Sequence, residues 1–262
     1  MAHVHANGVR LHVQRLPQPA PANLGPPLVL IHGMIDTLAG WYFTLAGPLA
    51  DLGFDVIAYD LRGHGRSERP ATGYSVGDAI EDLAGLLSAL GIDRPVRLVG
   101  NSLGGTIAFG FAERYPDRVD SLVVIESEPA TPAWAARTAD GLREVSELML
   151  DEVVMAAQPA IAHRVAAAAK AFDTDTKVID ELVDPRWLLD ADRIRRITAP
   201  VLLLVGGESA LSRRWDEFVP LLPDCRVEVV PGSEHLLLVT EPQRVTEIVL
   251  PWLAGQLAEP VA

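Results

Sequence analysis

The sequence is poor in cysteine. Cys225 is the single cysteine among 262 residues, so the chain can form no internal disulfide. The flanking stretch PDCRVEVV is typical of the entry to a strand and indicates a partly buried, inert thiol. No histidines and cysteines have the spacing of zinc ligands. The sequence therefore predicts neither a metal site nor an organic cofactor.

Positive charge and long apolar runs are also scarce. Lys and Arg number 22 against 35 Asp and Glu, a formal net charge of −13, which argues against nucleic acid and anionic membranes as partners. No run approaches the roughly 20 apolar residues of a membrane span. The opening MAHVHANGVRLHVQ lacks the apolar segment of a signal peptide. We therefore expect a soluble, cytoplasmic protein.

Strand-like and helix-like segments alternate along most of the chain. Asn7-Gly8 lies between short alternating runs and predicts a β-hairpin. Apolar runs predict buried strands at 27–33, 54–60, 94–100, 119–127, 199–207 and 225–232. Helical spacing predicts helices at 40–53, 75–91, 102–116, 212–222 and 241–257, with Ser75 as an N-cap. This alternation favours an α/β fold in which helices cover both faces of a parallel sheet.

The alternation stops between residues 129 and 195. The segments 139–158 and 160–172 keep helical periodicity, and no strand-like run lies among them. We therefore predict an all-helical cap at 129–195. It is inserted into a core domain formed by residues 1–128 and 196–262.

The stretch LVGNSLGG places Ser102 between Gly100 and Gly104, after a predicted strand and before a predicted helix. A serine in such a sharp strand-to-helix turn has its hydroxyl exposed at the top of the sheet. Side chains two positions away on either side would collide, which explains the glycines. Gly100-Asn101-Ser102-Leu103-Gly104 fits the G-x-S-x-G pattern in that context. Ser102 is therefore the candidate nucleophile.

A serine hydroxyl needs a base to become a strong nucleophile. His235, in VVPGSEHLLLV, follows the last predicted strand directly, in a region where catalytic groups collect in open α/β sheets. It is therefore the candidate base. The other six histidines are interpreted as structural or solvated: His3, His5 and His12 in the hairpin, His32 and His64 as organisers of loops, and His163 in the cap.

An acyl-transfer intermediate needs hydrogen-bond donors that are fixed before the reaction. One candidate is the backbone N–H of Leu103, just after the nucleophile. The second is the N–H of Met34, in the loop after the strand 27–33. Gly33 allows that loop to approach closely and is also a candidate substrate-binding residue.

Four motifs, in the order LIHGMIDTLAGW, YDLRGHGRS, LVGNSLGG and PGSEHLLLVTEP, resemble the α/β-hydrolase superfamily over nearly the whole chain. The resemblance implies an eight-stranded, mostly parallel sheet and a Ser-acid-His triad in that chain order. The helical insertion occupies the position of the family's cap. Since this scaffold supports many chemistries, the motifs do not fix the substrate.

The sequence departs from the family at the triad acid. Most members have an aspartate where this chain has Ser209, one residue after Glu208. A second family location follows the strand after the nucleophile helix, and there LVVIESEP places Glu126. This layout resembles that of haloalkane dehalogenases and fungal zearalenone lactonases. Glu126 is the favoured acid, with Glu208 and Glu128 as alternatives.

Ser102 excludes the aspartate-nucleophile chemistry of dehalogenases and epoxide hydrolases and favours hydrolysis of an ester or lactone through an acyl-enzyme. Alternatives are a lyase, a cofactor-free dioxygenase, or a ligand-binding protein on the same scaffold. Trp134 and Trp187, near the two ends of the cap, are candidates for the wall of a pocket for an apolar or aromatic substrate. Packing of the cap on the core is the other interpretation of these two tryptophans.

Overall fold

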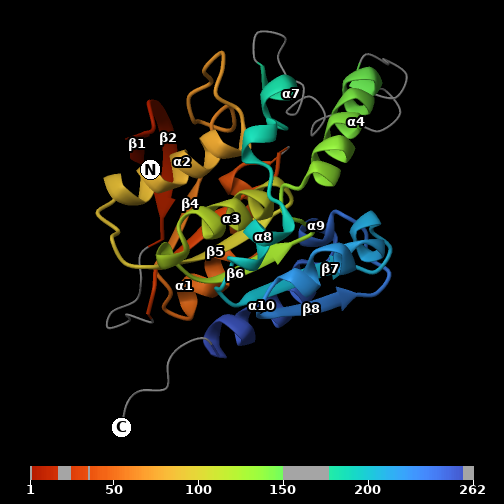
Figure 1. Cartoon of the computed structure of the whole chain (residues 1–262). Helices are drawn as coiled ribbons and strands as arrows, with labels where there is room; N and C mark the ends of the chain where they lie inside the picture. Colours follow the sequence, from red (N-terminus) through yellow and green to blue (C-terminus); the bar gives the residue numbers. More distant parts are fainter. Residues whose placement is uncertain (1, 17–24, 35, 150–176, 256–262) are drawn as a thin grey trace.

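In a computed structural model that describes residues 2–16, 25–34, 36–149 and 177–255, one eight-stranded sheet crosses the molecule (Figure 1). The strand order is β1-β2-β4-β3-β5-β6-β7-β8. β2 pairs antiparallel with β1 and β4, and all other pairs are parallel. The strands are β1 Ala2–Ala6, β2 Val9–Arg15, β3 Leu28–Ile31, β4 Val56–Tyr59, β5 Val96–Asn101, β6 Val119–Ile125, β7 Val201–Gly206 and β8 Cys225–Val230.

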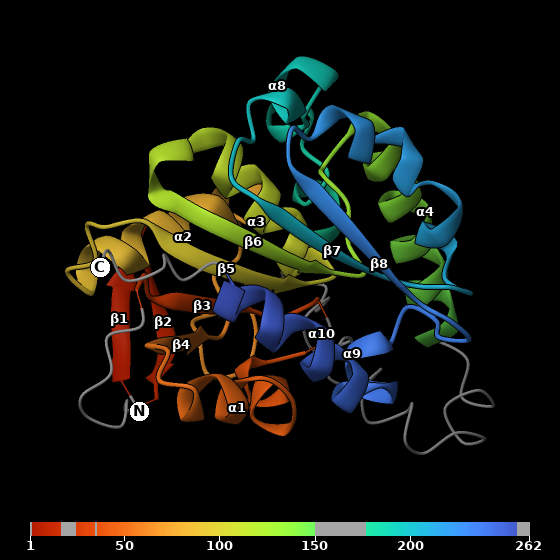
Figure 2. The same ribbon diagram turned by 90° about the horizontal axis from the view of Figure 1, so that it is seen from below.

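Helices cover both faces of this sheet, as the alternation in the sequence predicts. The α-helices are α1 Ala46–Asp51, α2 Val76–Ala89, α3 Leu103–Arg114, α4 Pro132–Met149, α7 Val178–Glu181, α8 Ala191–Arg195, α9 Leu237–Thr240 and α10 Pro242–Gly255. The 3₁₀ turns are η1 Leu38–Phe43, η2 Pro116–Arg118, η3 Pro185–Trp187, η4 Ala210–Arg213, η5 Trp215–Glu217 and η6 Val219–Leu221. Figure 2 shows α1 and α10 on one face of the sheet and α2 and α3 on the other.

The central strand β3 shows why both faces need cover. Leu28 and Leu30 pack with the apolar side chains of α1 and α10, whereas Val29 and Ile31 pack with those of α2 and α3. Successive side chains of a strand point to opposite faces. All four residues are fully buried, so β3 is an uninterrupted apolar run, as expected in a parallel sheet covered on both faces.

Local sequence signals set the ends of several elements. Asn7 and Gly8 have φ values of 47° and 77° and close the hairpin between β1 and β2, as Asn-Gly predicts. Ser75 caps α2: its side chain accepts from the Asp78 N–H, and the Asp78 side chain accepts from the Ser75 N–H. This reciprocal capping box confirms Ser75 as the N-cap.

Two predicted helices are broken in the structure. The segment 40–53 divides into part of η1 and the short helix α1, and the segment 212–222 consists mainly of three 3₁₀ turns, η4 to η6. In the second segment Pro220 lacks the N–H that a continuous α-helix requires at this position. Trp215 in this segment is partly buried and packs against the core.

The described parts of the chain between β6 and β7 contain helices joined by turns and irregular segments, and no strand. The helices are α4, α7, η3 and α8. The predicted helix 139–158 overlaps α4 up to Met149, while its remainder, the predicted helix 160–172 and His163 lie outside the described residues. The two ends of this segment meet on the core, because the Leu189 N–H donates to the Ala130 carbonyl at 2.7 Å.

Candidate active site

Ser102 lies in the turn that joins β5 to α3, with φ and ψ of 51° and −121°. A non-glycine residue is rarely found in this conformation. The glycines around it are required by close approach: a Cβ on Gly100 would lie 2.4 Å from the Gly104 carbonyl oxygen, and one on Gly104 would lie 2.0 Å from the Ile31 carbonyl oxygen. Neighbouring strands and α3 therefore hold the turn in place.

A hydrogen-bonded chain connects Ser102 to a histidine and a glutamate. The Ser102 Oγ lies 3.2 Å from His235 Nε2, and His235 Nδ1 lies 3.1 Å from Glu126 Oε2. With the proton on Nδ1, the imidazole donates to the carboxylate and accepts from the hydroxyl. Three residues that the sequence analysis selected from separate loops are thus in contact.

Glu126 is held at the tip of β6 in a buried position. It is 2% exposed and has a positive φ of 49°. Its Oε1 accepts a hydrogen bond from the Gly206 N–H at the end of β7, while Oε2 faces His235. A buried carboxylate is costly unless it is hydrogen-bonded, and here both oxygens are satisfied. The carboxylate is therefore fixed relative to the imidazole.

The other two candidate acids have different surroundings. Glu208 is exposed, at the start of the loop that follows β7. Glu128 is buried, but its Oε2 accepts from Arg137 and its Oε1 accepts from Arg214 Nε and Nη2, at 3.1 and 2.9 Å. The described contacts of His235 thus favour Glu126 over both alternatives.

The loop after β3 approaches the nucleophile closely. A Cβ on Gly33 would lie 3.3 Å from the Ser102 Cβ, so glycine permits this approach. Met34 follows in the same loop, and Leu103 begins α3. Among the described residues, neither the Met34 N–H nor the Leu103 N–H donates to a protein acceptor. Both amides are available to a bound ligand.

Two histidines support this loop, as the sequence analysis expected. His32 Nδ1 donates to the Gly33 carbonyl at 2.7 Å, and Nε2 accepts from the Leu61 N–H at 2.9 Å. This pattern requires a neutral ring, and burial lowers the pKa of His32 to about 3. His64 Nε2 lies 2.5 Å from the Met34 carbonyl oxygen. Burial also lowers the pKa of His64.

A cavity of about 510 Å³ opens above Ser102. Its floor consists of Gly33, Met34, Ser102, Leu103, Glu126 and His235, and its wall includes Trp134, Arg137, Arg214, Leu236 and Val239. Asp36 also lines it and accepts from the Thr37 N–H. The candidate substrate-binding residues Gly33 and Trp134 thus face the cavity.

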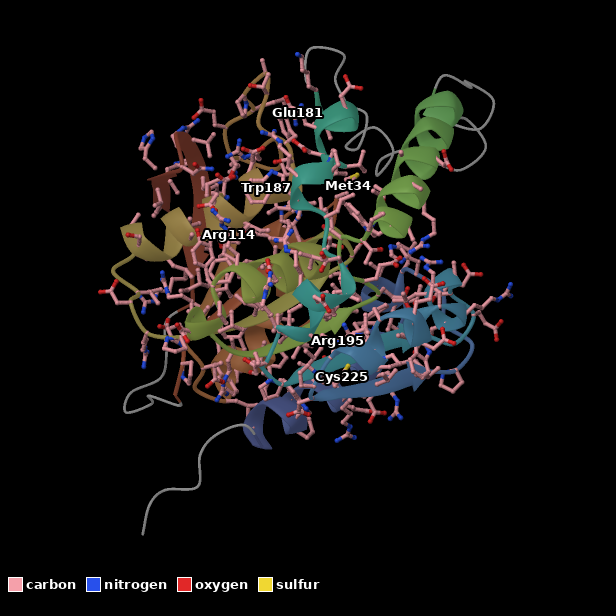
Figure 3. All side chains as sticks on the ribbon, viewed as in Figure 1. Met34, Arg114, Glu181, Trp187, Arg195 and Cys225 are labelled. Atoms are coloured by element: carbon pink, nitrogen blue, oxygen red, sulfur yellow. The ribbon has the colours of Figure 1, made fainter. Side chains whose placement is uncertain are left out.

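Trp187 is not among the described residues that line this cavity, which favours the other interpretation, packing on the core. Its indole fills the space that a side chain at Gly77 would occupy: a Cβ there would lie 1.9 Å from the Trp187 ring. The guanidinium of Arg114, on α3, lies over the same indole ring, 5.2 Å from the ring centroid (Figure 3). Trp187 therefore packs the segment before β7 onto α2 and α3.

The two arginines of the wall were not among the residues predicted from the sequence. Arg137 is on α4 and Arg214 lies between η4 and η5. Arg214 follows β7, at the sheet edge where ligand-binding loops collect, and that position was the available signal.

Within the described part of the chain, no group of three or more His, Cys, Asp or Glu residues is arranged to hold a metal ion. No described helix is long and apolar enough to cross a bilayer.

Comparisons with known proteins agree with this architecture. Residues 26–160 match the α/β hydrolase fold family. A 2-(acetamidomethylene)succinate hydrolase from Mesorhizobium japonicum is 32% identical over 84% of both chains. The chain therefore belongs to the α/β-hydrolase family, and its relatives include named hydrolases.

Solved structures of the same fold include named esterases and lactonases. Est816, described as an N-acyl homoserine lactone degrading enzyme, is 26% identical, with a TM-score of 0.71 over 94% of this chain and 98% of its own. An esterase from Thermogutta terrifontis is 24% identical, with a TM-score of 0.75 over 98% of both chains. The second comparison, at this lower identity, shows the fold alone.

Proposed function

We propose that this protein is a serine hydrolase that cleaves a carboxylic ester or lactone through an acyl-enzyme on Ser102. The observation that carries the proposal is the hydrogen-bonded chain from Ser102 Oγ through His235 to Glu126. The Ser102 hydroxyl at one end of this chain lines the cavity. The hydrolase relative and the lactone-degrading Est816 support the same class of reaction.

In the first half of the reaction, His235 Nε2 takes the Ser102 proton while Oγ attacks the carbonyl carbon. Glu126 orients the imidazole and stabilises its positive charge. The Met34 and Leu103 N–H groups donate to the oxyanion, with the positive end of the α3 dipole behind Leu103. His235 then gives the proton to the departing alcohol oxygen, which leaves the acyl group on Ser102.

In the second half, His235 takes a proton from a water molecule, and the hydroxide attacks the acyl-enzyme carbonyl. The tetrahedral intermediate collapses, and His235 returns the proton to Ser102 Oγ. Acid, base and nucleophile are thereby restored. In a lactone the departing alcohol stays attached to the acyl group, so the product is a single hydroxy acid.

We further propose that residues 129–195 form a cap over this cavity, because α4 contributes part of its wall. Trp134 from α4, together with Leu236 and Val239 near α9, gives the wall apolar surface. This supports a substrate with an apolar or aromatic body. The core domain is then residues 1–128 and 196–262.

The test is the pre-steady-state release of 4-nitrophenol from a short acyl ester, with Ser102→Ala as the matched variant. A burst equal to the enzyme concentration, absent from Ser102→Ala, is the expected result, because an acyl-enzyme accumulates before water releases it. Release that does not depend on Ser102, or no release, would contradict the proposal and favour a lyase, a dioxygenase or a binding protein.

A further inference from the structure

One face of α4 is turned toward the cavity. Trp134, Arg137, Thr138 and Gly141 all line it, and their spacing is that of one stripe along a helix. Gly141 leaves room beside Arg137, since a Cβ there would meet nothing within 4 Å. This stripe therefore brings a guanidinium group to the same cavity as Ser102.

Arg137 belongs to a cluster in which two cations face one anion. Glu128 is buried and pairs with both Arg137 and Arg214. The two arginines come from α4 and from the segment after β7, and all three side chains line the cavity. Among the described side chains, this corner of the wall thus carries one more cation than carboxylates.

The excess donors belong to Arg137. Arg214 is fully engaged, because Nε and Nη2 bond Glu128 and Nη1 bonds the Ala210 carbonyl at 2.9 Å. Arg137 bonds Glu128 through Nη2 alone. Its Nε is buried without an acceptor among the described residues. A buried N–H without a partner is destabilising. The Arg137 side chain is 35% exposed and lines the cavity, so the edge of the guanidinium that faces away from Glu128 can receive a further anionic acceptor.

The other described carboxylates that line the cavity have different partners. Glu126 is bonded to His235 and to the Gly206 N–H, and Asp36 accepts from the Thr37 N–H in the loop after β3. Two arginines on one buried carboxylate also occur at Glu113, which pairs with Arg193 and Arg196. The feature that a contact between α4 and the core leaves unexplained is the unpartnered Nε of Arg137 beside the cavity.

From this geometry we propose that Arg137, supported by Glu128 and Arg214, binds a carboxylate of the substrate. The inference rests on the proposed function and narrows its substrate class to esters or lactones that carry a second, ionised carboxyl group. Glu128 and Arg214 are positioning residues that orient the Arg137 fork. Arg137 touches the substrate carboxylate through charge-assisted hydrogen bonds.

The test compares esters that differ only in this charge. Mono(4-nitrophenyl) adipate and 4-nitrophenyl hexanoate have acyl chains of equal length that end in a carboxylate and in a methyl group. A second pair, the hexanoyl esters of 4-hydroxybenzoate and 4-hydroxybenzamide, carries the charge on the departing phenol. We expect kcat/KM to favour the charged member of at least one pair by about 10- to 100-fold.

Substitutions then show which residue causes the preference for the charged ester. Arg137→Gln is expected to reduce the charged-to-neutral ratio to about one, and Arg214→Gln to reduce it in part. Arg213→Gln is the matched control, because Arg213 is exposed in the same turn and does not line the cavity. Ratios near one in the parent protein for both pairs would overturn the inference. An unchanged ratio in Arg137→Gln, with equal losses on both esters, would show a purely structural role.

Calorimetry measures ester binding directly, so it tests the carboxylate site independently of the proposed acyl-enzyme on Ser102. Ser102→Ala, titrated with the same four esters, reports binding without turnover by the serine. Tighter binding of the charged member, lost when Arg137→Gln is added, supports the carboxylate site even if turnover proves independent of Ser102. Equal binding of charged and neutral members overturns the inference even if the acyl-enzyme is demonstrated.

Discussion

The floor of the cavity is made by backbone turns at the carboxyl ends of the parallel strands, whereas the wall above it is made by side chains. On the floor, Ser102 and Glu126 have positive φ values, and Gly104 presses against the carbonyl of Ile31. On the wall, the described hydrogen-bond partners of Arg137 and Arg214 are Glu128 and the Ala210 carbonyl. The floor is fixed by steric exclusion, and the wall by pairing of charges.

Glu126 and Glu128 show this contrast within three residues of chain. Both are buried, but Glu126 faces the imidazole of His235 and Glu128 faces two guanidinium groups. We infer that a change on the floor alters the rate of the reaction for every substrate. A change on the wall alters which substrates react.

The largest expected effect is on the floor. Glu126→Gln keeps an acceptor for the Gly206 N–H but removes the charge that stabilises the imidazolium. We expect kcat for any ester to fall by about 10³- to 10⁴-fold, with little change in the thermal midpoint. Steady-state kinetics and thermal unfolding measure both quantities.

Glu208→Gln is the matched control, since that carboxylate is exposed after β7, and its kcat should equal that of the parent protein. Near-normal turnover in Glu126→Gln would remove this residue from the triad. Loss of turnover in Glu208→Gln would assign the role there instead.

A second substitution tests whether steric exclusion holds the floor. In Gly104→Ala the new Cβ would lie 2.0 Å from the Ile31 carbonyl oxygen and 2.8 Å from that of His32, so the backbone must move. We expect the free energy of unfolding to fall by about 1–3 kcal/mol, measured by urea denaturation. Gly47→Ala in α1, where a Cβ meets nothing within 4 Å, should be neutral or slightly stabilising. Equal effects of the two substitutions would contradict this view of the floor.

The smallest effect concerns the loop that contains Met34. The pKa of His32 is about 3 in the folded protein because burial disfavours its charge, against 6.5 ordinarily. Above pH 6.5 neither state is protonated, and between pH 6.5 and about 3 only the unfolded chain takes up the proton. The free energy of unfolding should therefore fall with decreasing pH, by at most about 1.4 kcal/mol per pH unit from this group.

His32→Gln should flatten that slope when urea denaturation is repeated from neutral pH to pH 5. His5→Gln, at an exposed position of β1, should leave the slope as it is in the parent protein. An unchanged slope in His32→Gln would show that His32 is not the group that takes up the proton.

The residues of the floor could be predicted from the sequence because the backbone conformations they need restrict which residue types can occur there. Gly100, Ser102 and Gly104 have a fixed spacing that only a sharp strand-to-helix turn needs. His235 follows the last strand of the sheet, and Glu126 follows β6. Parallel strands bring their carboxyl ends to one edge, so these residues meet even though they are far apart in the chain.

The wall was not predictable in the same way. Glu128, Arg137 and Arg214 come from three elements whose relative placement depends on packing, and an arginine has no positional signature. The two interpretations of Trp187 could not be separated from the sequence for a similar reason. Its partner Gly77 is distant in sequence, and a glycine does not indicate which side chain packs against it. The broken helix at 212–222 was hidden by apolar spacing, although Pro220 marked it.

The hydrogen bond between Ala130 and Leu189 has a consequence for substrate specificity. The segment between β6 and β7 leaves the core and rejoins it at adjacent positions. A change in its length therefore need not move β6 or β7. Lengthening a flexible loop costs little entropy once its ends are held together, about 0.6 kcal/mol for each doubling. Substitutions in this segment that keep the contact of Trp187 with Gly77 can therefore change which substrates bind, while Ser102, His235 and Glu126 stay in place.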